Sequence, residues 1–180
     1  MAAAGVISRA AAAAPVGFAG WTTGGNPSVD ANLGLPPPSW QVPGNASYFW
    51  RDDHTAHTGF AFKMMSQGLA DFFFGCSAAG AGEMFRIDTR ANGNWAGFAT
   101  TNSWKSWNAP ASGFYAPPNT WIAVTLTLRA GEASARCTWA GGAATVTLKG
   151  YKPSGTAYGF QGDGLGATSF TWVSGFQALG

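Results

Sequence analysis

The densest group of metal-ligating side chains is the run R-D-D-H-T-A-H at residues 51–57. Its carboxylates and imidazoles suit zinc, and they belong to Asp52, Asp53, His54 and His57. H-x-x-H in a strand or loop does not fix two imidazoles on one side, as H-x-x-x-H does on a helix, and no third ligand is identifiable elsewhere. The run is therefore interpreted as a solvated polar loop, with zinc as the weaker alternative, and no cofactor is expected.

A second candidate site is the aromatic segment N-W-A-G-F-A-T-T-N-S-W-K-S-W-N-A-P-A-S-G-F-Y, residues 94–115. Flat rings can stack on the apolar faces of sugars, while nearby amides bind hydroxyls. The rings available for this are Trp95, Trp104, Trp107 and Tyr115. In an extended segment Trp104 and Trp107 point to opposite faces, so we expect one in the core and one exposed. An exposed ring could equally anchor a protein partner.

A third possibility is a pair of catalytic carboxylates. Glycan hydrolases hold two acids roughly 5 Å apart for retention or about 6.5–9.5 Å apart for inversion. The glutamates of the chain are Glu83, just before an expected strand, and Glu132, in an R-A-G-E turn. Asp88 follows Glu83 by five residues and so faces the other side of the strand. No strand carries acids at i, i+2 and i+4, and we therefore expect no enzymatic activity.

The elements that position these residues are predicted to be strands. After residue 40, apolar alternation recurs between turn residues, and no window shows a sustained helical period. The strands expected are Tyr48–Arg51, Thr58–Met65, Asp71–Cys76, Met84–Thr89, Trp95–Thr100, Trp121–Arg129, Ala133–Trp139, Ala143–Leu148, Ala157–Gln161 and Phe170–Gln177. In the strand that begins at Trp121, the core-facing residues are Ile122, Val124, Leu126 and Leu128. So many strands imply two packed sheets.

Three segments resemble the concanavalin A-like and laminin-G-like jelly rolls. They are N-T-W-I-A-V-T-L-T-L, a hairpin that ends in W-A-G-G, and the closing F-T-W-V-S-G-F-Q-A-L-G. The resemblance covers roughly residues 45–180 and implies an all-β, two-sheet antiparallel jelly-roll sandwich with a tendency to bind glycans or proteins. Some laminin-G-like domains hold calcium, for which Asp52, Asp53 or Asp163 could serve. The glycines that flank Asp163 are more typical of a turn.

Composition excludes several classes of function. Only 10% of the 180 residues are charged, and the basic residues are scattered, which argues against binding to nucleic acid. No run of 18 or more apolar residues is present, so no membrane span is expected. So low a surface charge favours association, and we expect a homo-oligomer. Cys76 and Cys137 are expected to be free, buried thiols.

The N-terminal part is predicted to differ from the rest. Residues 1–39 are interpreted as an alanine-rich arm and a Pro/Gly linker, and residues 40–180 as the sandwich domain. Arg9 interrupts a weakly hydrophobic stretch, so the arm matches a secretory signal poorly. An alanine-rich terminus frays unless something holds it. We therefore expect it to pack on another subunit through Val6, Ile7, Arg9, Val16, Phe18 and Trp21.

Three functions follow from these patterns. The main expectation is a non-enzymatic structural or decorating protein of a multi-subunit particle, such as a phage capsid or tail, that docks on other subunits through its arm. It would lie at a virion surface or outside the cell, where a cell-surface glycan is a further partner. The alternative is a lectin-like carbohydrate-binding module. A second alternative is a glycan hydrolase that uses Glu83 and Glu132.

Overall fold

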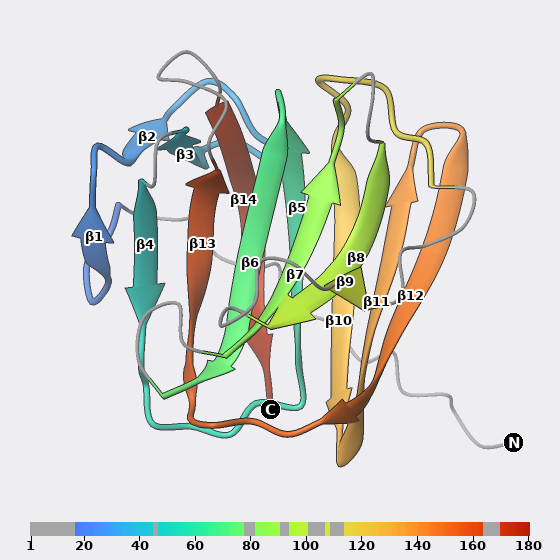
Figure 1. Ribbon diagram of the computed structural model, residues 1–180. Coiled ribbons are helices and arrows are strands. Elements are labelled where there is room, and N and C mark those ends of the chain that lie inside the picture. The colour runs from blue at the N-terminus through green and yellow to red at the C-terminus, as the bar shows by residue number, and fades with distance from the viewer. Residues whose placement is uncertain are drawn as a thin grey trace, which may run out of the picture.

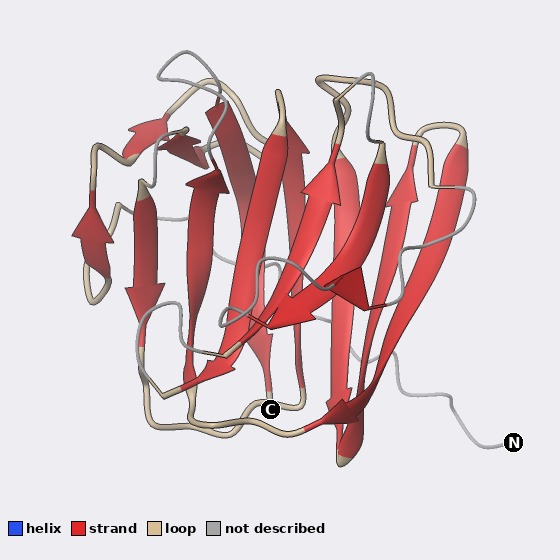
Figure 2. Ribbon diagram, in the orientation of Figure 1, coloured by secondary structure: helices blue, strands red, loops and turns tan. Residues whose placement is uncertain are grey.

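The protein is a sandwich of two antiparallel β-sheets (Figure 1). The computed structural model describes residues 17–44, 47–77, 82–90, 94–100, 107–108, 114–163 and 170–180. In these ranges the chain forms strands, turns and loops, and Figure 2 shows no helix among them. The same ranges hold no helix long and apolar enough to cross a membrane. The predicted all-β jelly-roll sandwich is confirmed.

The front sheet faces the viewer in Figure 1. Its order is β1 (Thr22–Gly24), β4 (Tyr48–Arg51), β13 (Ala157–Asp163), β6 (Leu69–Cys76), β7 (Glu83–Asp88), β8 (Trp95–Thr100) and β9 (Trp107–Asn108). Neighbours in this order pair antiparallel, and β13 brings the C-terminal part of the chain between β4 and β6. The centre of the sheet is therefore assembled from segments far apart in sequence.

The back sheet lies behind the front one. Its order is β12 (Gly142–Tyr151), β11 (Gly131–Trp139), β10 (Ile122–Arg129), β5 (Gly59–Ser66), β14 (Phe170–Leu179), β3 (Ser39–Pro43) and β2 (Ser28–Asp30). The consecutive strands β10, β11 and β12 form hairpins, whereas β5 and β14 pair across the chain. The strand β14 closes the sheet against both β3 and β5.

Alternating apolar residues fill the space between the sheets. The predicted core face of β10 is confirmed, because Ile122, Val124 and Leu126 are at most 1% exposed and Leu128 packs against the same cluster. The centre of the core is aromatic: the ring of Phe72 lies 4.7 Å from that of Phe160. Aromatic rings bury large apolar areas and pair favourably at such distances, which suits a wide space between two sheets.

A bulge in β14 places Val173 and Phe176 on the same face of the strand, toward the core. Gly175 has a positive φ of 62°, and the pairing with β5 shifts between Ser174 and Gln177. Glycine adopts this conformation without a steric penalty. The shift allows both Val173 and Phe176 to pack in the core although they lie three residues apart.

Residues 17–38 pack on the sandwich itself, in contrast to the predicted arm. Trp21 lies among core aromatics, 5.2 Å from Trp40 and 5.6 Å from Tyr158, and Phe18 lies 5.2 Å from Phe49. The short strands β1 and β2 extend the two sheets. The physical reason is that burial of these large rings in the core of their own domain stabilises the fold without association with another subunit. Val6, Ile7, Arg9 and Val16 lie outside the described residues.

Both cysteines are free and buried, as predicted. Cys76 ends β6 in the front sheet, and Cys137 lies in β11 of the back sheet. Burial raises the pKa of Cys137 to about 12, so this thiol stays protonated and behaves as a small apolar side chain.

Candidate functional site

A row of residues in register crosses the outer face of the front sheet. The pairing of β4, β13, β6, β7 and β8 places side by side Tyr48, Gln161, Asp71, Arg86 and Gly97. Because side chains alternate along a strand, all five lie on the face opposite the core residues Phe72 and Phe85. We call these five residues the polar row.

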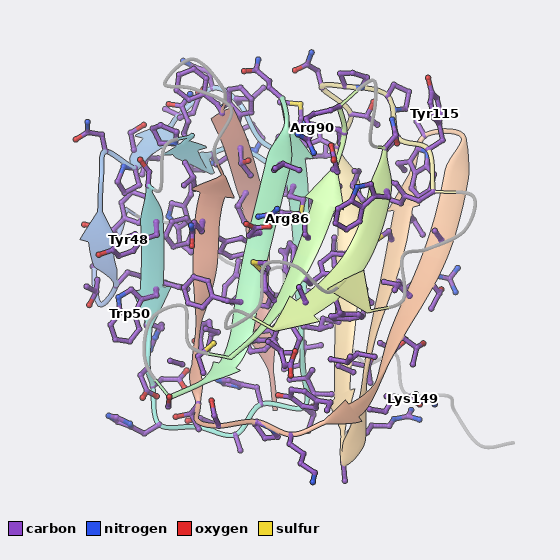
Figure 3. The ribbon with its side chains drawn as sticks, in the orientation of Figure 1. Tyr48, Trp50, Arg86, Arg90, Tyr115 and Lys149 are labelled. Atoms are coloured by element: carbon purple, nitrogen blue, oxygen red, sulfur yellow. The ribbon has the colours of Figure 1, made fainter. Side chains whose placement is uncertain are left out.

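The centre of the polar row is a buried ion pair. The Nε and Nη2 atoms of Arg86 donate to the Oδ1 and Oδ2 atoms of Asp71, each at 2.6 Å. Asp71 is 1% exposed and Arg86 is 6% exposed, although both belong to an outer face. Two parallel hydrogen bonds fix the plane of both groups. In Figure 3 the Arg86 side chain lies over the centre of the front sheet.

A second ion pair lies beside the row, toward the upper end of the sheet. Asp88 is fully buried, and its Oδ2 accepts from the Nη2 atom of Arg90 at 2.6 Å. The Nε atom of Arg90 also donates to Oδ1 at 2.9 Å. Arg90 retains 41% side-chain exposure and so presents this pair to solvent. Hydrogen bonds therefore hold the charged groups of both pairs in defined positions on the outer face of the front sheet.

Aromatic side chains flank the polar row. Trp50 is half-buried and packs against a small outer-face cluster of Phe73, Cys76 and Ala157. Figure 3 shows Tyr48 and Trp50 on β4, on the side of the sheet nearer β1. Trp95 pairs in register with Asp88 near the other edge. Rings thus border the charged groups on both sides.

The loop between β4 and β5 forms a separate polar cluster. The Nε2 atom of His57 lies 3.0 Å from the Oδ2 atom of Asp53, which also accepts from the Tyr158 hydroxyl at 2.8 Å. Asp52 accepts from the Thr156 hydroxyl at 2.6 Å. Each carboxylate of this loop thus has protein donors already in place.

These contacts bear on the predicted metal ligands. The His54 side chain is 86% exposed and lies 3.4 Å from Asp52, whereas His57 is nine-tenths buried against Asp53. Among the described residues, no three His, Cys, Asp or Glu side chains form a group that could hold a metal ion. The donor set is divided into two separate pairs, of which His54 with Asp52 is exposed and His57 with Asp53 is largely buried. The Asp163 side chain lies outside the described residues.

No protein-family model matches the chain, and no curated protein matches it in sequence. Solved structures do match its fold. The exoplasmic/lumenal domain of VIP36 in a Ca²⁺/Man-bound form is similar with a TM-score of 0.60 and 10% identity, over 87% of this chain and 81% of that one. The legume lectin-like domain from Entamoeba histolytica gives 0.60 at 8% identity, over 90% and 91%. The carbohydrate-binding module CBM66 from Bacillus subtilis gives 0.51 at 10%, over 88% and 92%.

The fold is that of the concanavalin A-like jelly rolls. The predicted resemblance is confirmed for the fold. It does not extend to individual residues, because identities near 10% establish no residue correspondence. In this jelly roll the polar row occupies the outer face of the front sheet, and the β4–β5 loop lies at the lower end in Figure 1.

Two of the predicted stacking residues can be placed in the jelly roll. The Asn94 side chain clamps Ala116, donating to its carbonyl at 3.0 Å and accepting from its N–H at 2.8 Å. These two hydrogen bonds hold Trp95, which follows Asn94, close to Tyr115, which precedes Ala116. Trp95 is half-buried and Tyr115 is 67% exposed. The remaining two cannot be compared with the prediction: Trp104 and the side chain of Trp107 lie outside the described residues.

The glutamates of the hydrolase alternative lie in different sheets. Glu83 begins β7 in the front sheet, where burial raises the pKa of its carboxyl. Glu132 lies in β11 of the back sheet and pairs with Lys149. This arrangement gives no support to a shared catalytic cleft.

The residues of the two ion pairs were missed as site candidates from sequence. Arg86 and Asp88 alternate with the core residues Phe85 and Ile87, so they lie on the outer face. A charged residue inside an apolar strand was the available signal, as in A-D-F-F-F for Asp71. Its pairing depends on strand register, which alternation alone does not reveal.

Proposed function

We propose that the protein is a non-enzymatic carbohydrate-binding module that holds a sugar on the outer face of its front sheet. The observation that carries the proposal is the buried Asp71–Arg86 pair in the middle of the polar row. Transfer of two charges from water to a buried site costs several kcal/mol per ion. The attraction between the two charges offsets roughly this cost. A charge pair of this kind adds little net stability, and a role in recognition explains why it occupies an outer face.

The chemistry of the row suits sugar hydroxyls. Gln161 supplies both an amide donor and an acceptor beside Asp71, and Tyr48 adds a hydroxyl and a flat ring. Both side chains are half-buried, so they are reachable from solvent. In this proposal Tyr48 and Gln161 contact the sugar, while the ion pair fixes the charges beside them.

The similar solved structures add support at the level of the fold. Besides the Man-bound VIP36 domain and CBM66, they include winged bean acidic lectin complexed with methyl-α-D-galactose, at a TM-score of 0.57 and 11% identity. No comparison supports a virion or particle role. The docking arm, the protein-subunit partners and a location outside the cell therefore stay predictions.

The test is a matched pair of glutamine variants. Gln161→Ala removes the amide next to the ion pair, and Gln177→Ala removes a half-buried glutamine from β14 of the back sheet. Affinity gel electrophoresis against a panel of soluble polysaccharides, followed by calorimetry with methyl-α-D-mannoside and methyl-α-D-galactoside, measures binding. We expect Gln161→Ala to weaken binding about three- to tenfold, the effect of one lost hydrogen bond, and Gln177→Ala to leave it unchanged.

Thermal unfolding of both variants serves as the folding control. If no polysaccharide or glycoside binds the wild-type protein, the proposal fails. If binding occurs but responds equally to both substitutions, the sugar site lies away from the polar row.

A further inference from the structure

A pocket of about 420 Å³ opens at the lower end of the sandwich. The β4–β5 loop, the β10–β11 turn and the β12–β13 connection meet at this end in Figure 1. The main apolar side chains of its wall are Phe60, Leu128 and Pro153. The polar side chains of the wall are those of Thr55, His57, Thr58, Arg129, Tyr151 and Thr156. Ligand pockets are typically apolar with a few polar groups, and this volume lies at the small end of their range.

Backbone hydrogen bonds hold the rim of this end pocket in place. The Leu128 N–H donates to the Thr58 carbonyl at 2.7 Å and so joins the turn to the loop. The Gly75 carbonyl accepts from the N–H groups of Ser154 and Gly155 at 2.8 and 3.1 Å. A pocket fixed in this way needs no ordering of loops when a ligand enters, which favours binding.

Most hydrogen-bond donors of the end pocket are already used by the protein. The threonine hydroxyls donate away from it, and the pairs are Thr55 with the Asp53 carbonyl at 3.2 Å, Thr58 with the Gly180 backbone oxygen at 2.9 Å, and Thr156 with Asp52 at 2.6 Å. The Nε2 atom of His57 faces the Asp53 carboxylate. These four side chains therefore offer the pocket methyl groups, an aromatic edge and lone pairs.

Two donors remain. Within the described ranges, the Tyr151 hydroxyl has no hydrogen-bond partner. The Arg129 guanidinium forms no ion pair there, although Glu132, its register partner on β11, interacts with its charge while pairing with Lys149. Burial raises the pKa of Tyr151 to about 12, so the hydroxyl keeps its proton at neutral pH. Tyr151 is buried, whereas Arg129 is exposed at the end of β10. A ligand oxygen at the mouth of the pocket would meet a positive charge, and one deeper inside would meet a neutral donor.

We propose that the end pocket binds a small aromatic carboxylate. The ring lies between Phe60, Leu128 and Pro153, and the carboxylate pairs with the guanidinium of Arg129 and accepts from the Tyr151 hydroxyl. A planar guanidinium matches a carboxylate in geometry as well as charge. The site is independent of the polar row, which lies on another surface of the molecule.

Benzoate and its uncharged isostere benzamide are the probes, with binding measured by saturation-transfer NMR and calorimetry on the full chain. We expect saturable benzoate binding, with benzamide about tenfold weaker because it lacks the charge-assisted hydrogen bond. Arg129→Gln is expected to abolish this preference for benzoate. Tyr151→Phe is expected to weaken benzoate about three- to tenfold, since it removes one donor and keeps the ring.

A blocking variant tests the location. Ala56 is exposed at the pocket rim, so Ala56→Trp places a bulky ring across the mouth and is expected to abolish benzoate binding. Ala140→Trp, in the exposed β11–β12 turn, and Arg136→Gln, on the outer face of β11, are controls that should bind as the wild type does.

Three results would overturn the proposal: no saturable benzoate binding, unchanged binding in Ala56→Trp, or equal affinities for benzoate and benzamide in the wild type. Displacement of benzoate by a methyl glycoside would instead assign the end pocket to sugars. Loss of polysaccharide binding in Gln161→Ala with benzoate binding retained would separate the two sites.

Discussion

Asp71 and Arg86 combine two properties that seldom occur together on the outer face of a sheet. They are ionised partners at 2.6 Å, and both are almost completely buried. Removal of one charge from such a pair is costly, because little water can reach the buried partner to replace it. Substitution of one residue is therefore expected to lower the free energy of unfolding by far more than the intact pair contributes to it.

Asp71→Asn is expected to lower the free energy of unfolding by about 3–5 kcal/mol, because it removes the charge that accepts two hydrogen bonds from the buried Arg86 guanidinium. Urea unfolding at pH 7 measures the loss. Glu132→Gln is the matched control: Glu132 and Lys149 also pair across neighbouring strands, but the Lys149 side chain is 78% exposed. The control is expected to cost about 0–1 kcal/mol. Equal losses in the two variants would refute the buried-charge interpretation.

The β4–β5 loop is the element that links the pocket rim to the core. Asp53 anchors it by accepting from His57 within the loop and from Tyr158 of β13. Burial acts to raise the pKa of Asp53, but the hydrogen bonds from Tyr158 and His57 outweigh it, so the pKa lies below its ordinary value of 3.8. Asp52 and Arg51 are the other charged groups near Tyr158.

A lowered pKa makes this anchor sensitive to acid. A carboxyl whose pKa is lower in the folded state stabilises the fold above its unfolded pKa, and this contribution is lost as the pH falls through the folded value. We expect the wild type to lose more unfolding free energy than Asp53→Asn between about pH 5 and pH 2.5. Urea titrations at several pH values give the comparison. Parallel pH profiles for the two proteins would show that Asp53 does not anchor the loop.

Elements differ in how far the sequence revealed them. The strand β10 was evident because its apolar residues alternate over eight positions and its partner β11 follows directly. β1 and β2 have three residues each; β1 pairs with β4, past two intervening strands, and β2 pairs with the next strand, β3. Their Gly, Pro and Ser neighbours predicted a linker, because a strand this short carries too little alternation to detect.

At the scale of the whole molecule, the N-terminal segment has two parts with different expected effects. Deletion of residues 2–16 retains the core contacts of Phe18 and Trp21, so it should lower the melting temperature less than a deletion that reaches Phe18. Deletion of residues 2–20 also removes the half-buried Phe18, and we expect a loss of about 1–2 kcal/mol in unfolding free energy. Thermal and urea unfolding of the two truncated proteins test this difference.

The mass in solution of the protein lacking residues 2–16 tests the assembly arm separately. If the full chain self-associates and this truncated protein is a folded monomer, residues 2–16 carry the association. If both have the same oligomeric state, residues 2–16 have no role in self-association, and the prediction that Val6, Ile7 and Arg9 dock on a second copy of the chain is wrong.

The sequence by itself determined the all-β class, most of the strands and the core-facing residues of β10. These properties follow from alternation within one segment, which is local. The burial of Asp71 and Arg86, the use of Trp21 in the core and the end pocket were decided only by the tertiary structure. Each depends on segments that lie side by side through strand register or loop packing, and no local pattern encodes which distant segment becomes the neighbour.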